Sequence, residues 1–273
     1  EEARMIQYLQ NAQGVFQVVG PFIPSRTVQE KISSRDVDSS AHFVIGQFGI
    51  PAPKGNLFPR SPFINDYPFP ELADVSAGVG HISIIPDTLD GVIRSAPLFV
   101  EYAGRLYPTL GLALSMHERG LTAKDLQFEV GDGSMTVTVG GVEIPTGPIG
   151  EVNINYVGAP DVFPSVGFYD ILVAARDRNA AFFEQFRDKV CIIGPTVRSL
   201  GDFYATPIAE STPGYITHAN MYDMIASGAF ATSAPRELTI LILLSLTLAI
   251  GAVAHQRSMR SGVVVLVIAL VIY

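Results

Sequence analysis

The feature that most constrains this chain is an uncharged apolar run near its C-terminal end. Residues 238–254 read LTILILLSLTLAIGAVA, which is 17 residues without a charged side chain. The run is apolar on every side, which argues against the alternative of a buried core helix with one polar face. A second uncharged run covers residues 262–273. About 17 to 25 apolar residues span the hydrocarbon core of a bilayer, so the two runs predict a transmembrane helical hairpin within residues 236–273.

The link between the two runs predicts their orientation. Residues 255–261 read HQRSMRS and carry Arg257 and Arg260 but no acid. Short basic loops stay in the cytoplasm, so we expect residues 255–261 to be cytoplasmic. We therefore expect a domain over residues 1–235 on the outer side of a bacterial inner (plasma) membrane, and transmembrane helices over residues 236–273.

Composition excludes several classes of function. The net charge is -8 and no basic tract is present, so the electrostatic signature of nucleic-acid binding is missing. Apolar residues make up 48% of the chain and charged residues 16%, which excludes intrinsic disorder. The single cysteine, Cys191, rules out an intrachain disulfide and a cysteine-based zinc site. Its apolar neighbours predict a buried core position.

Residues 1–235 alternate between strand-like and helix-like patterns. The alternation predicts an α/β fold class, with a mixed sheet and flanking helices. We expect strands within residues 14–20, 80–86, 95–104, 126–147, 152–158 and 189–194, the last of them buried, and helices within residues 1–12, 108–120, 165–176, 179–188 and 217–228.

The densest polar cluster is PDTLDGVIR, residues 86–94. Asp87, Asp90 and Arg94 fit either a charged pocket that binds a cation or a tight turn between two strands. The spacing of the acids does not match a calcium loop of the EF-hand type. Asp-Gly suits turns because glycine tolerates a positive φ, so the turn is the favoured interpretation.

Two later stretches also carry candidate ligand-binding residues. Asp202 and Thr206 follow the predicted strand at 189–194, and ligands often lie beyond the carboxyl ends of strands in α/β sheets. His218 and Asn220 lie near the start of a predicted helix, where an anion can bind. The alternatives are a loop that crosses the surface for the first stretch, and a helix cap with a packed histidine for the second.

Motifs for common enzymes are missing from the sequence. No G-x-S-x-G nucleophile motif and no paired histidine spacing for zinc occurs. A membrane-tethered periplasmic hydrolase that uses Asp87, Asp90 or Asp202 remains as the alternative function. The sequence predicts no cofactor and no metal site.

A family resemblance emerges from residues 80–114, GHISIIPDTLDGVIRSAPLFVEYAGRLYPTLGLAL. This run resembles the signature of the second class of CHASE domains, which are extracellular sensory domains of bacterial adenylate/guanylate cyclases and histidine kinases. Further elements of the family follow in order: INYVG (154–158), VCIIG (190–194), ATP (205–207) and PGYITHAN (213–220). The family's N-terminal portion and its output domain are not seen in this sequence.

The resemblance implies a function that composition alone does not reveal. It implies the signal-sensing input and membrane part of a bacterial transmembrane receptor, which regulates a cytoplasmic adenylate/guanylate cyclase or, as second choice, a histidine kinase. The chain itself is then not an enzyme. The expected partners are a small-molecule or physical signal, membrane lipid and a second copy in a homodimer, and the candidate signalling residues are Asp87, Asp90, Arg94, Asp202, Thr206, His218 and Asn220.

Overall fold

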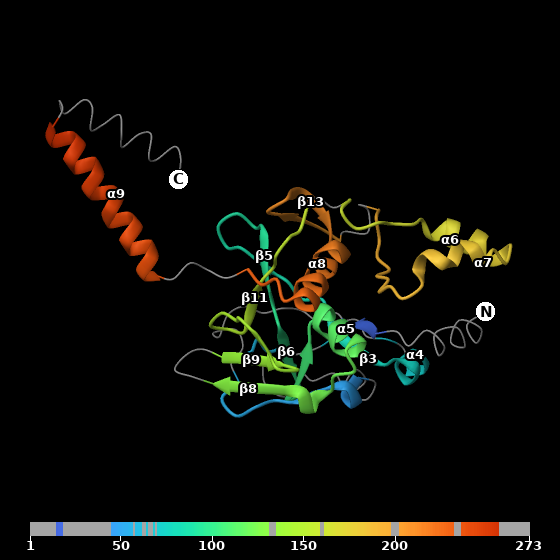
Figure 1. Cartoon of the computed structure of the whole chain (residues 1–273). Coiled ribbons are helices and arrows are strands. Elements are labelled where there is room, and N and C mark those ends of the chain that lie inside the picture. Colours follow the sequence, from blue (N-terminus) through green and yellow to red (C-terminus); the bar gives the residue numbers. More distant parts are fainter. Residues whose placement is uncertain are drawn as a thin grey trace. The chain divides into compact units, whose positions relative to one another are not determined.

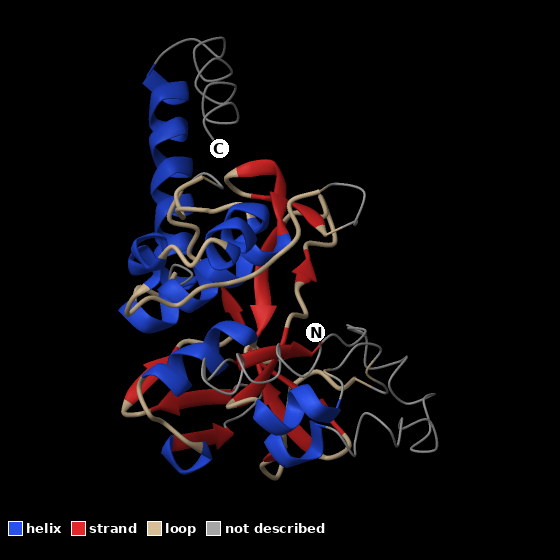
Figure 2. Ribbon diagram, turned by 90° about the vertical axis from the view of Figure 1, so that its right-hand side faces the viewer, coloured by secondary structure: helices blue, strands red, loops and turns tan. Residues whose placement is uncertain are grey.

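The computed structural model describes residues 15–18, 45–56, 58–61, 64, 68, 70–130, 135–158, 161–197, 202–231 and 236–256. The chain divides into two compact units, Glu1–Ala231 and Thr232–Tyr273. The first unit combines helices and strands (Figures 1 and 2), which confirms the expected mixture of α and β structure. Instead of one mixed sheet, the described strands form five small sheets.

Most strand pairs in the first unit are antiparallel. The parallel pair joins β1 (Val15–Val18) to β3 (Gly78–His81). The antiparallel sheets run in the orders β2 (Ile50–Pro51), β7 (Arg105–Pro108), β6 (Phe99–Tyr102); β4 (Ile85–Pro86), β5 (Ile93–Pro97), β11 (Glu151–Asn153); β8 (Leu126–Val130), β9 (Met135–Val139), β10 (Val142–Ile144); and β12 (Phe203–Thr206), β13 (Ala209–Pro213). Most of the predicted strands are therefore confirmed, although many are shorter than expected.

The described helices of the first unit are short, apart from α8. They are α4 (Pro70–Val75), α5 (Leu110–Glu118), α6 (Phe168–Arg176), α7 (Ala180–Phe183) and α8 (Gly214–Ser227), with 3₁₀ turns η2 (Gly46–Phe48), η3 (Ala123–Asp125) and η4 (Glu184–Phe186). The helix α8 ends at Gly228, whose φ of 70° is left-handed and whose N–H bonds to the carbonyl of Met224. This is the helix end that glycine favours. The predicted helix over residues 1–12 lies outside the described residues.

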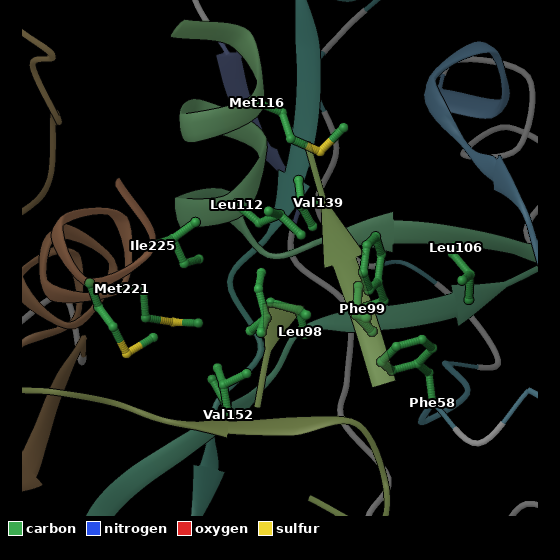
Figure 3. Close-up of a cluster of buried hydrophobic side chains, with 14 of the residues drawn as sticks. Phe58, Leu98, Phe99, Leu106, Leu112, Met116, Val139, Val152, Met221 and Ile225 are labelled. Carbon is green, nitrogen blue, oxygen red and sulfur yellow. The ribbon is translucent and has the colours of Figure 1, made fainter. Parts of the chain in front are cut away.

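A buried apolar cluster joins α5 and α8 to the strands. Figure 3 shows Leu112 and Met116 of α5 facing the same cluster as Met221 and Ile225 of α8. The strands and the loop before them complete it with Phe58, Leu98, Phe99, Leu106, Val139 and Val152. This cluster therefore holds both helices against the strands.

The helix α5 lies unusually close to its neighbours because two glycines lack side chains. A Cβ added to Gly111 of α5 would lie 2.7 Å from the backbone nitrogen of Tyr222 in α8. A Cβ added to Gly80 of β3 would lie 2.6 Å from the Cα of Leu110. The hydroxyl of Tyr222 in α8 also donates to the carboxylate of Glu118 in α5 at 2.7 Å. Glycine thus brings β3, α5 and α8 into backbone contact.

The predicted buried strand at residues 189–194 is wrong. The described residues form no strand there, Ile193 is 82% exposed, and Cys191 is exposed rather than part of the core. A short apolar run fits a buried strand only where a neighbouring strand pairs with it, and its periodicity does not reveal whether one does. In this structure the segment continues from η4 without strand pairing to any described residue.

The second unit contains α9 (Arg236–Gln256). In the part of the chain that the structure describes, no helix is both long enough and apolar enough to cross a membrane. This finding overturns the predicted transmembrane hairpin. The 17 uncharged residues of α9, 238–254, are the lower limit of the roughly 17 to 25 that span a hydrocarbon core, and the helix begins with the charged residues Arg236 and Glu237. The predicted second arm, residues 262–273, lies outside the described residues.

Replacement of Gly111 by alanine tests the close helix contact. The added methyl group overlaps the backbone of α8, so we expect Gly111→Ala to lower the free energy of unfolding by about 1–3 kcal/mol in urea denaturation. The matched control is Gly251→Ala in α9, where nothing lies within 4 Å of the added Cβ. That control should lose no stability. A Gly111→Ala protein as stable as the wild type would contradict the packing.

Candidate functional site

A pocket of about 200 Å³ lies beside the helices α5 and α8. Its walls come from five places in the sequence, which are the residue after β3, the start of α5, the segment 192–195, the residue before β12 and the start of α8. The lining residues are Ile82, Leu110, Ile192, Ile193, Gly194, Pro195, Asp202, Tyr215 and His218. The wall is therefore mainly apolar, with a carboxylate, a phenol and an imidazole.

Two glycines allow the walls to approach α8. A Cβ added to Gly194 would lie 2.5 Å from the Cβ of Tyr215, so glycine lets the segment 192–195 pass directly beside the helix. A Cβ added to Gly214 would overlap the carboxylate of Asp202. The backbone N–H of Gly214 also donates to the carbonyl of Asp202 at 3.0 Å. These contacts fix Asp202 at the N-terminus of α8.

The carboxylate of Asp202 lies beside the N-terminal end of α8. The N-terminal end of a helix carries partial positive charge, which stabilises a nearby carboxylate. Among the described residues, no Lys or Arg forms an ion pair with Asp202. Burial, and then the nearby carboxylate of Asp202, raise the pKa of the Tyr204 hydroxyl. Asp202 thus places a negative charge at the pocket that no described cation neutralises.

Two buried histidines lie at this part of the fold. His218 of α8 is 5% exposed, and burial lowers its pKa from 6.5 to about 4. His81 of β3 is 3% exposed, and burial together with repulsion from His218 lowers its pKa to about 3, against the opposing effect of the carbonyls of Leu98 and Pro97. Both rings are therefore neutral at physiological pH. The Nδ1 atom of His218 and the Nε2 atom of His81 have no hydrogen-bond partner among the described residues.

Of the residues predicted from the sequence, Asp202 and His218 meet in the pocket. Thr206 does not join them, because its buried hydroxyl bonds to Thr212 at 2.8 Å within the β12–β13 hairpin. Asn220 is fully buried and links α8 to the strand-like segment after β11, since its Oδ1 accepts from the N–H of Val157 at 2.9 Å. Thr206 and Asn220 therefore make buried hydrogen bonds within the fold and do not reach the pocket.

The predicted cluster of Asp87, Asp90 and Arg94 forms a separate group in the turn between β4 and β5. Arg94 makes a bidentate pair with Asp90 at 2.9 and 2.7 Å, and its Nη1 lies 3.2 Å from Asp87. Each carboxylate also accepts a backbone N–H inside the turn, from Leu89 and Val92. The hydrogen bond from Arg94 is the main cause that lowers the pKa of Asp90 to about 2. The acids are thus engaged within the turn.

Sequence reasoning missed most of the pocket wall. Ile82, Leu110 and Tyr215 carry no motif of their own, and residues 192–194 belong to the stretch that the sequence predicts as a buried strand. The available signal was the pair Gly194 and Gly214, because a glycine beside a bulky neighbour marks a close backbone approach. Among the described residues, no group of three or more side chains is placed to hold a metal ion.

Comparison with known proteins identifies the family. The model of the CHASE2 domain matches residues 3–253. The chain belongs to the CHASE2 domain family. CHASE2 domains are extracellular sensory input domains of signalling receptors and act as sensors, not as catalysts. No curated protein matches the chain. No solved structure matches it either.

The buried histidines predict that this CHASE2 domain loses stability in mild acid. Between about pH 6.5 and 4, His81 and His218 bind protons in the unfolded chain but not in the folded state. The free energy of unfolding should therefore fall as the pH falls through this range, by up to about 1.4 kcal/mol per pH unit for each histidine. Urea denaturation at several pH values measures the slope. His218→Gln should reduce it, whereas the exposed control His117→Gln should leave it unchanged; equal slopes in all three proteins would contradict the assignment.

Proposed function

We propose that this chain is the signal-sensing input of a bacterial receptor that regulates an adenylate or guanylate cyclase, or, as second choice, a histidine kinase. Membership of the CHASE2 family supports the sensory role. The pocket at Asp202 and His218 supplies the place where a signal molecule binds.

The single observation that carries this proposal is that α8 is both a pocket wall and a core helix. Tyr215 and His218 line the pocket from the first two turns of α8. Met221 and Ile225, one and two turns later, pack in the core against α5. A ligand that shifts the start of α8 therefore acts on buried contacts that have few alternative arrangements.

The chain connectivity gives the signal a route toward the C-terminus. The helix α8 ends at Ser227, and the next described helix, α9, begins at Arg236. Any effect of α8 on an output that follows it in the chain has to act through residues 228–235. Ligand binding changes the output only if the ligand favours one of two conformations of α8 and the chain that follows it.

The competing hydrolase is left with one candidate acid, Asp202. It requires free acids at Asp87, Asp90 or Asp202 to activate water. Asp87 and Asp90 are engaged by Arg94 and by backbone N–H groups of their own turn. Asp202 lies in a mainly apolar pocket with a neutral histidine.

Filling the pocket in the full-length receptor tests the sensory function. We expect Ile192→Trp to change the cyclase or kinase activity at least about fivefold, because the added ring occupies the pocket and shifts the equilibrium of α8. The matched control, Ile149→Trp, lies in an exposed turn outside the pocket lining and should change activity less than about twofold. Equal activities of the two folded variants would contradict the proposal.

A further inference from the structure

The polar groups of the pocket are all suited to one kind of ligand. Asp202 supplies a carboxylate, and no lysine or arginine among the described residues lines the pocket. His218 is neutral because burial lowers its pKa to about 4. The ring of Tyr215 adds an aromatic side chain, and aromatic rings attract cations through their quadrupole. A positively charged ligand therefore meets several favourable groups, whereas an anion meets a carboxylate.

The apolar part of the wall sets a second requirement. Five lining side chains are aliphatic, namely those of Ile82, Leu110, Ile192, Ile193 and Pro195. A hydrated metal ion would leave these groups facing water and gain nothing from them. An organic ion with an alkyl body covers them instead. Its charged nitrogen can then remain beside Asp202.

The volume limits the size of this ligand. Drug-sized ligands occupy pockets of about 300–1,000 Å³, and this pocket measures about 200 Å³. A short branched or cyclic alkyl group with one nitrogen suits a pocket below that range better than a drug-sized ligand does.

We propose that the pocket binds a small organic ammonium ion that carries one positive nitrogen on a compact apolar body. This inference rests on the proposed sensory function and deepens it by naming the class of signal. Asp202 pairs with the ammonium group, and the neutral ring of His218 adds no competing positive charge at the site. The net charge of -8 adds a long-range attraction for cations.

A matched set of three compounds tests this inference on the purified chain. They are 3-methylbutylammonium chloride, 3-methylbutanol and sodium 3-methylbutanoate, which share one alkyl body and differ in charge. Binding is measured by NMR titration at constant ionic strength and pH 7. We expect the ammonium ion to bind about tenfold or more tightly than the alcohol, and the carboxylate to bind least, because the pocket offers a negative charge.

Variants assign this preference to the pocket. Asp202→Asn should weaken binding of the ammonium ion about tenfold while it leaves binding of the alcohol unchanged. Asp74→Asn removes the same charge from the exposed surface of α4, outside the pocket lining, and should leave both affinities unchanged. Tyr215→Leu keeps an apolar side chain and should cost about threefold through loss of the aromatic face.

The outcomes separate the ligand class from the sensory function. Equal affinity for the ammonium ion and the alcohol would overturn the inference, as would an unchanged ammonium affinity in folded Asp202→Asn protein or no binding of any of the three compounds. In each of these cases, an altered output in the Ile192→Trp receptor would leave the sensory proposal standing. If the ammonium ion binds as expected and the Ile192→Trp receptor behaves as its control, the pocket binds cations but does not control the output, and the sensory proposal fails.

Discussion

The backbone contact of α5 with β3 on one side and α8 on the other is the constraint on which the rest of the first unit depends. Gly80 and Gly111 make it possible, because a methyl group at either position would overlap a backbone atom of the neighbouring element. Interiors packed at this density do not deform continuously, so they change by discrete shifts. The same contact brings the start of α5 and the start of α8 to the edge of one pocket, so the core and the candidate site share their walls.

The residues of the pocket have environments that suit binding more than chemistry. Asp202 lies beside the N-terminus of α8, where the backbone N–H of Gly214 donates to its carbonyl. His218 and His81 are held neutral by burial, which costs stability once the pH falls toward their lowered pKa values. A domain of the CHASE2 family has to respond to its surroundings, and groups that the fold holds in one charge state give a ligand well-defined partners.

Local patterns predicted much of the secondary structure, whereas contacts between distant segments were harder to foresee. The helix end at Gly228 was predictable, because it depends on the positive φ of one glycine. The apolar run at residues 189–194 was misassigned to a buried strand, since burial depends on what packs against it. The turn of Asp87, Asp90 and Arg94 was predicted as the favoured interpretation. The meeting of Asp202 with His218, Tyr215 and Ile82 follows only from the tertiary fold.

The central claim is that the segment 192–195 and the start of α8 enclose a ligand site that acts on the helix pair. Hydrogen exchange of the full chain with and without 3-methylbutylammonium chloride tests this claim most directly. The account predicts slower exchange of backbone amides in residues 192–195 and in α8, with the β8–β9 hairpin unchanged as an internal reference. Unchanged exchange in α8 when the compound is bound, or protection confined to the β8–β9 hairpin, would contradict it.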